Sequence, residues 1–167
     1  MGDARWLDVA NAAQDAAEHF RNAVALHAEG GFNAPGLDGY KAIMAFMHSV
    51  QSGHTSLESA LCRVLDILGE ERPTGDSWHD DLIRRASQAR PGLRPPILGK
   101  GMAARADETR KFRHLATRSY GRFRASEAKA TVAAARALAR GLIGELDRFR
   151  QLIDPPEAAG TRKRRRP

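Results

Sequence analysis

The sequence predicts an all-α protein, an antiparallel bundle of four to five helices. Apolar residues recur at steps of three and four over long segments, which is the period of an amphipathic helix. Aromatic residues make up only 6% of the chain, and alanine supplies much of its 42% hydrophobic share. That composition favours helix over sheet. No segment shows the alternation of polar and apolar residues that is typical of a strand.

Two long helical segments are expected in the first part of the chain. One covers about residues 3–29 and ends at Gly30-Gly31, since glycine terminates helices. The other begins near Leu37, and it is either one helix bent at Gly53 or two helices, the second starting at a capping box, Thr55-Ser56-Leu57-Glu58. The residues expected on the buried faces are Trp6, Val9, Ala13, Ala16, Ala17, Phe20 and Val24 in the first segment, and Tyr40, Ile43, Met44, Met47 and Val50 in the second.

Three further helices are expected after residue 77. A short one covers residues 78–89, and the prolines at positions 91, 95 and 96 then impose a loop. The other two cover residues 101–120 and 126–153. Residues 1–153 are therefore interpreted as one helical domain, and residues 154–167 as a disordered basic tail. The face expected to be buried in the last helix holds Val132, Ala135, Leu138, Leu142, Leu146, Phe149 and Ile153.

Charge and cysteine content narrow the possible functions. The formal net charge is +7, and a basic protein attracts phosphates without specifying which molecule carries them. Cys62 is the only cysteine, which excludes an intrachain disulfide and a thiolate metal site, and we expect it in the core. The N-terminus lacks the apolar stretch of a signal peptide, and no apolar run approaches membrane-spanning length, so a cytoplasmic location is expected.

The strongest functional candidate is the basic segment from Arg110 to Arg124, which holds five arginines, a lysine, a histidine and a tyrosine. A guanidinium binds phosphate through a planar fork of donors, and an imidazole exchanges protons near neutral pH. A solvated basic face is the alternative that composition alone leaves open. On a helix, one side of this segment would carry Arg110, Arg113, His114, Thr117 and Arg118.

Four segments carry a resemblance to a known family. They are Trp78-His79 at a helix start, the loop Pro91-Gly92-Leu93-Arg94-Pro95-Pro96-Ile97-Leu98, Phe112-Arg113-His114, and Arg118-Ser119-Tyr120-Gly121. Together they resemble the HEPN superfamily, most closely the HepT-like ribonuclease toxins, over about residues 3–153. The resemblance implies a homodimer whose two motifs meet in a shared cleft and cleave RNA without a metal or another cofactor. It also implies an antitoxin partner of the nucleotidyltransferase type.

The family motif is an arginine, four to six residues and a histidine, often followed two places later by a tyrosine. The resemblance implies that Arg113 is the motif arginine and that Tyr120 is the tyrosine, the target of nucleotide transfer by the antitoxin. Arg118 stands where the histidine is expected, and an arginine cannot shuttle protons because it stays protonated. His114, four residues before Arg118, is the expected substitute. The site candidates are thus Arg113, His114 and Arg118 for catalysis, Tyr120 for modification, and Arg110, Thr117 and Arg122 for phosphate binding.

These residues support more than one hypothesis. The first is an active HepT-like toxin ribonuclease. The second is a catalytically lapsed HEPN module that binds RNA, a nucleotide or a nucleotidyltransferase, and Arg118 at the histidine position favours it. A third is a helical scaffold that only assembles with other proteins.

The remaining histidines are weaker candidates. His79, at the start of a short helix, either forms local hydrogen bonds or lines the cleft, and a structural role is favoured because an isolated histidine is weak evidence for a site. His48 and His54 lack the i, i+4 spacing of a helical metal pair, and no metal site is predicted.

Overall fold

The computed structural model describes residues 4–118 and 123–155, except for the side chains of residues 114–118. Within these residues the elements are α1 (Ala4–Glu29), α2 (Leu37–Ile67), α3 (Trp78–Ser87), α4 (Lys100–Arg118), a 3₁₀ helix η1 (Ala125–Ala128) and α5 (Lys129–Ile153). The described part of the chain contains no β-strand. The predicted all-α fold is confirmed.

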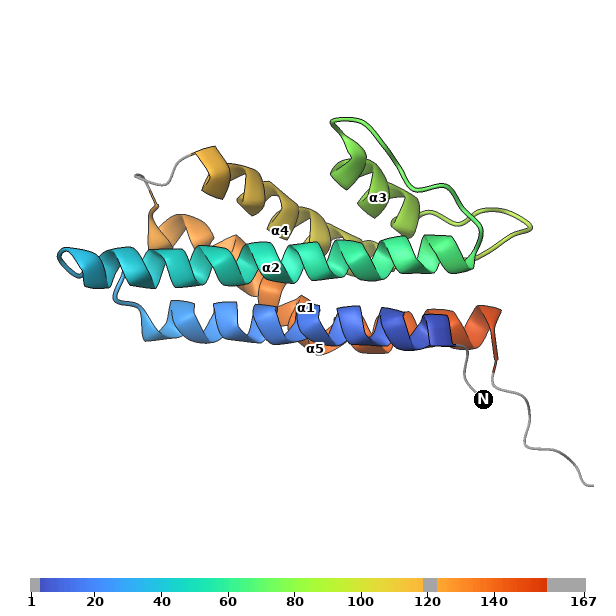
Figure 1. The fold of residues 1–167 in the computed structure, drawn as a ribbon, viewed down its shortest axis with the longest axis horizontal. Helices are drawn as coiled ribbons and strands as arrows, with labels where there is room; N and C mark the ends of the chain where they lie inside the picture. The colour runs from blue at the N-terminus through green and yellow to red at the C-terminus, as the bar shows by residue number, and fades with distance from the viewer. Residues whose placement is uncertain (1–3, 119–122, 156–167) are drawn as a thin grey trace, which may run out of the picture.

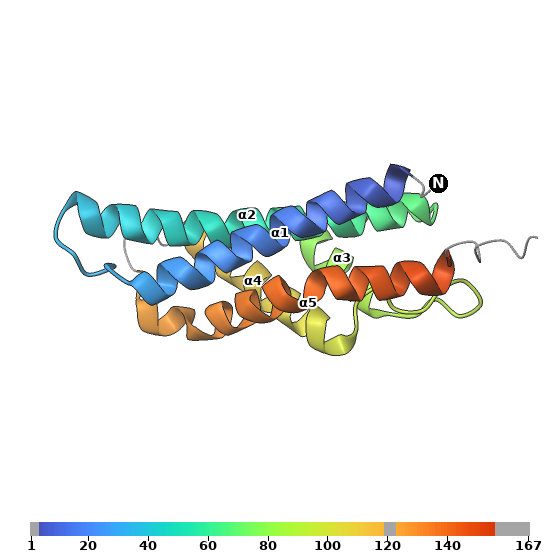
Figure 2. The same ribbon diagram turned by 90° about the horizontal axis from the view of Figure 1, so that it is seen from below.

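Four helices form the bundle, and the short α3 packs on its side. Helix α1 contacts α2 and α5, and α4 contacts α5 and α2, so the four helices make a ring. Neighbours in this ring run in opposite directions (Figures 1 and 2). Helix α3 lies against α2 and α4 near the end of the bundle where α1 begins (Figure 1). The junction of α2, α3 and α4 is where the candidate site lies.

The core follows the apolar stripes of the helices. On α1, Trp6, Val9 and Phe20 are buried as expected, and alanines between them let α2 and α5 approach closely. The expected stripe of α5 is buried from Val132 to Phe149. A second, smaller cluster around Phe46 and Phe112 fills the opposite end of the bundle. Of the residues expected inside on these two helices, Val24 and Ile153 are only partly buried.

Helix α2 is continuous from Leu37 to Ile67, which decides between the two interpretations of this segment. Gly53 does not interrupt the helix. It allows α1 and α2 to pack closely, because a Cβ at this position would lie 2.8 Å from the ring of Phe20 on α1. The capping box expected at Thr55–Glu58 is wrong. These residues lie inside α2, and the Glu58 side chain is buried.

Tyr40 is not in the core, contrary to expectation. It is 60% exposed, whereas the preceding Gly39 is buried against the backbone of Ala34. The turn before α2 therefore packs on the glycine and directs the tyrosine outward. Phe46, which the sequence analysis did not select, is fully buried instead.

The proline-rich loop is held by a buried arginine. Arg94 donates from Nε to Oε1 of Glu70 (2.6 Å) and from Nη1 to the carbonyl oxygen of Gln88 (2.9 Å). Burial raises the pKa of Glu70, but the hydrogen bonds and the charge of Arg94 outweigh burial and hold that pKa below its ordinary value. Arg94 thus has a structural role. In the described part of the chain, no helix is both long and apolar enough to cross a membrane.

Candidate functional site

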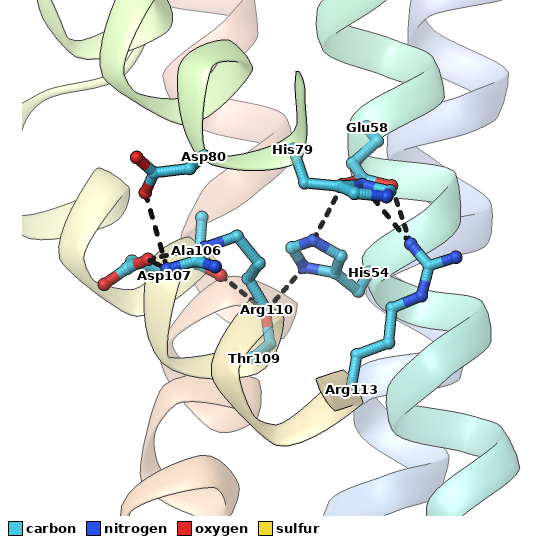
Figure 3. A network of polar contacts seen from close by, with 9 residues as sticks. All are labelled: His54, Glu58, His79, Asp80, Ala106, Asp107, Thr109, Arg110 and Arg113. Carbon is cyan, nitrogen blue, oxygen red and sulfur yellow. Dashed lines mark hydrogen bonds and ion pairs between the residues drawn. The ribbon is translucent and has the colours of Figure 1, made fainter. Parts of the chain in front are cut away.

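A cluster of polar side chains interrupts the apolar packing where α2, α3 and α4 meet (Figure 3). We call it the polar cluster. Helix α2 supplies two of its members, α3 one and α4 two. They are His54, Glu58, His79, Thr109 and Arg113.

The α2 helix places His54 and Glu58 one turn apart on its core-facing side. Both side chains are buried, with relative exposures of 0% for His54 and 3% for Glu58. Val50 precedes and Leu61 follows them on the same apolar stripe. Because burying a charge costs free energy unless it is paired, the Glu58 carboxylate requires partners at this position.

The carboxylate of Glu58 is the hub of the polar cluster. Its Oε1 lies 3.0 Å from Nε2 of His54 and is also in contact with Nδ1 of His79. Its Oε2 accepts a hydrogen bond of 3.3 Å from Nη1 of Arg113. Burial raises the pKa of Glu58, but the hydrogen bonds and charges of His54 and His79 outweigh this and leave the pKa below its ordinary value. Glu58 is therefore ionised at neutral pH.

The inner end of the cluster is anchored to α4 through Thr109. The Thr109 hydroxyl donates to the carbonyl oxygen of Ala106 (2.9 Å), and its oxygen lies 2.9 Å from Nδ1 of His54. An ionised Glu58 requires a hydrogen on Nε2 of His54, because a bare nitrogen lone pair would face a carboxylate oxygen. Each nitrogen of the His54 imidazole thus has a partner, Thr109 at Nδ1 and Glu58 at Nε2. His54 therefore holds the Glu58 carboxylate in place from its buried side.

The outer end of the cluster is formed by Arg113 and His79. The side chain of Arg113 is 33% exposed, and its Nη1 lies 3.4 Å from Nδ1 of His79. The side chain of His79 is 18% exposed. Its imidazole stacks on the neighbouring indole of Trp78, with ring centroids 3.7 Å apart. The outer end therefore brings a partly exposed guanidinium and a partly exposed imidazole against the buried carboxylate of Glu58.

Next to this outer end is a pocket of about 400 Å³. Three arginines line it, Arg63, Arg72 and Arg113, together with Trp78. Arg63 also pairs with Asp8 (3.5 Å), and Arg72 pairs with Asp66 (2.9 Å). Cys62 also lines the pocket while packing against the core, and burial raises the pKa of its thiol. The full lining is Thr55, Glu58, Ser59, Cys62, Arg63, Arg72, Trp78 and Arg113. Cations and an aromatic ring are the groups that recognise phosphates and nucleobases.

The family to which this chain belongs follows from a comparison with protein families. Residues 45–153 match the family model described as HepT-like protein. The chain belongs to the HepT-like family of the HEPN superfamily. The matched region includes every member of the polar cluster. Neither the curated proteins nor the solved structures contain a match.

Of the predicted site residues in this HepT-like chain, Arg113 lies in the polar cluster and Arg110 lies outside it. Nη2 of Arg110 pairs with Asp107 (2.7 Å) and with Asp80 (3.4 Å), so two carboxylates hold this guanidinium away from Glu58 (Figure 3). His114, Thr117 and Arg118 belong to α4, but their side chains are outside the described part. Tyr120 and Arg122 lie outside the described residues altogether.

The sequence analysis missed three members of the cluster and gave a fourth a different role. His54, Glu58 and Thr109 were not selected, and His79 was expected to be structural. A usable signal was present, because His54 and Glu58 are four residues apart within the apolar stripe that includes Val50. An acidic residue on a core-facing stripe indicates a buried partner.

Within the described residues of this HepT-like protein, no group of three or more histidine, cysteine, aspartate or glutamate side chains could hold a metal ion.

Proposed function

We propose that this HepT-like protein is a HEPN-type endoribonuclease that cleaves single-stranded RNA without a metal, as the toxin of a toxin–antitoxin pair. One observation carries the proposal. Arg113, the residue that the resemblance implies as the motif arginine, lies beside an imidazole and a carboxylate at the edge of an arginine-lined pocket.

The chemistry of RNA cleavage explains why this combination supports the proposal. The 2′-hydroxyl must lose a proton, the leaving oxygen must gain one, and the phosphate oxygens must be stabilised by positive charge. Arg113 supplies the charge and stays protonated throughout. Arg118 adds positive charge on the same helix in this proposal, and His114 is the proton carrier implied by the sequence.

The pocket supports single-stranded RNA as the substrate. Arg63 and Arg72 offer guanidinium groups to the phosphates of neighbouring nucleotides, and the partly buried indole of Trp78 offers a surface for base stacking. Bases of single-stranded RNA are unstacked and can lie on such aromatic rings, whereas bases inside a duplex cannot.

The same site supports a second function, a catalytically lapsed HEPN module that binds RNA, a nucleotide or a nucleotidyltransferase. Two observations favour it. Arg118 replaces the motif histidine, and Glu58 offsets the charge of Arg113 through an ion pair of 3.3 Å. This alternative predicts binding of RNA without cleavage.

The partners implied by the family complete the proposal. The active unit is a homodimer in which residues 1–153 form the folded domain and two copies of Arg113 face one cleft. A nucleotidyltransferase-type antitoxin modifies Tyr120 in the cytoplasm. Coexpression with a minimal nucleotidyltransferase should then add the mass of one or more nucleotides to the protein, and Tyr120→Phe should abolish the addition.

The decisive experiment is a cleavage assay with single-stranded RNA in EDTA. Wild-type protein should cleave, and Arg113→Ala should reduce the rate by about 100-fold or more, as expected for loss of a transition-state charge contact. Arg136→Ala is the matched control, because it removes the same charge from an exposed position on α5. Intact RNA at a large excess of wild-type protein would contradict the nuclease, and tight binding under those conditions would support the lapsed module.

A further inference from the structure

We propose that His79 is the general base of this site and that Glu58 is its positioning residue. The inference rests on the proposed ribonuclease function and assigns the proton transfer that Arg118 cannot perform. It moves this role from α4, where the resemblance implies it, to the first turn of α3.

A hydrogen bond to Glu58 orients the imidazole of His79. Nδ1 of His79 contacts Oε1 of Glu58, and the lowered pKa of Glu58 leaves this oxygen an acceptor. Nδ1 therefore carries the hydrogen, and in the neutral ring the lone pair is on Nε2. A base needs this tautomer, because Nε2 is then the atom that takes a proton.

The carboxylate that orients His79 is itself held in place. His54 holds Oε1 of Glu58 from the buried side, and Thr109 ties His54 to α4. Trp78 restrains the plane of the His79 ring by stacking. A buried carboxylate that fixes the tautomer of a histidine and stabilises its imidazolium is the arrangement used by catalytic triads.

Charged side chains from α2 and α4 lie beside His79. Glu58 on α2 and Arg113 on α4 both contact it. On its own helix, the neighbouring Asp80 pairs instead with Arg110 (3.4 Å), as Figure 3 shows. Glu58 thus places a negative charge beside the ring that accepts the proton, while Arg113 lies 3.4 Å away and can bind the phosphate undergoing attack.

The proposed step is a transesterification. Nε2 of His79 removes the proton of the ribose 2′-hydroxyl, and the 2′-oxygen forms a bond to the adjacent phosphorus. The bond between phosphorus and the 5′-oxygen breaks, and that oxygen takes its electron pair and a proton from solvent. The products are a 2′,3′-cyclic phosphate and a 5′-hydroxyl, and the imidazolium returns its proton to solvent.

The cleavage test compares His79→Gln with His48→Gln, which changes an exposed histidine on α2. His79→Gln should lower kcat by about 100-fold or more, the usual contribution of a general base, and should remove the acidic limb of the pH–rate profile. His48→Gln should leave both unchanged. Equal binding of a 2′-O-methyl oligonucleotide by wild type and His79→Gln shows that the variant is folded and that the loss is in kcat rather than KM.

The outcomes separate this inference from the proposed function. Cleavage by wild type and by His79→Gln at equal rates overturns the role of His79 and leaves the ribonuclease standing. Loss of the acidic limb in His114→Gln but not in His79→Gln assigns the base to His114 and overturns the inference. No cleavage by wild type at any pH overturns both.

A second measurement does not depend on activity. In ¹⁵N NMR spectra of the full chain, the neutral imidazole of His79, assigned by its loss in His79→Gln, should show the Nδ1–H tautomer. Observation of the Nε2–H tautomer would mean that Glu58 does not orient the ring for base catalysis and would overturn the inference.

Discussion

Nε2 of His54 and Oε1 of Glu58 lie 3.0 Å apart, one helical turn from each other, on the buried side of α2. A carboxylate and an imidazole are costly inside a bundle unless each satisfies the other. Here the pair connects the interior of the bundle to the partly exposed side chains of His79 and Arg113. The stability of the bundle and the chemistry of its site therefore depend on the same carboxylate.

The first prediction concerns pH and stability. Because the pKa of Glu58 is lower in the folded protein than its ordinary value of 4.5, its contribution is complete above that value and is lost as pH falls through the folded pKa. Glu58→Gln should lower the free energy of unfolding at pH 7 by about 1–3 kcal/mol and should weaken its decline on acidification. Urea titrations at pH 7 and pH 4 measure both effects. Glu29→Gln, an exposed change at the end of α1, is the control, and an equal acid response in both variants would contradict the prediction.

The second prediction concerns the close contact of α1 and α2. A Cβ on Gly53 would lie 2.8 Å from the Phe20 ring, whereas a Cβ on Gly144 of α5 would meet nothing within 4 Å. Gly53→Ala should therefore cost about 1–3 kcal/mol through overpacking, despite the better helix propensity of alanine. Gly144→Ala should be neutral or stabilising, by up to about 1 kcal/mol. Thermal unfolding of the two variants compares them directly, and a stable Gly53→Ala would show that the helices are not this close.

The third prediction concerns the arginine beneath the proline-rich loop. Arg94→Ala should lower the free energy of unfolding by about 1–3 kcal/mol, because it removes the buried donor to Gln88 and leaves Glu70 paired with the exposed Arg90 (3.3 Å) instead of a buried guanidinium. The comparison is Arg84→Ala, which removes an exposed arginine paired with Asp81 and should change stability little. Chemical denaturation tests this, and similar losses in both variants would contradict a structural role specific to Arg94.

The fourth prediction concerns the pocket as an RNA-binding surface. Trp78→Ala should weaken binding of a 2′-O-methyl oligonucleotide by about 1–3 kcal/mol, the usual contribution of one stacked base, and Trp78→Phe should recover most of it. Affinity should also fall steeply as salt rises, because phosphate contacts release counterions. Fluorescence anisotropy at several salt concentrations measures both. Binding that Trp78→Ala leaves intact would place the RNA elsewhere.

Much of the fold was predictable because helical periodicity is a local property. The expected stripes of α1 and α5 are buried over most of their length, since each follows from the residue pattern of one helix. The predictions for individual residues are wrong where contacts with another segment of the chain determine the local structure. Gly53 has the residue type of a break but accommodates Phe20, and Tyr40 is exposed because the turn packs on Gly39.

The candidate site was predictable only at its arginine. The resemblance implies Arg113 from a pattern contained in one helix, and this residue lies in the polar cluster. His54 and Glu58 are four residues apart on α2, and Thr109 and Arg113 are four residues apart on α4, but no pattern along the chain joins one pair to the other. His79 was noticed, but its significance depends on a carboxylate twenty-one residues earlier in the chain.

The amino-acid sequence by itself determined the all-α class, the apolar faces of the long helices and the HepT-like relationship, because each is encoded within a continuous stretch of chain. Tertiary structure alone decided that Glu58 is buried and shared between two histidines and Arg113, and that the pocket opens beside them. The physical reason is that a buried charge is set by what surrounds it, and those groups come together only when α3 and α4 pack on α2.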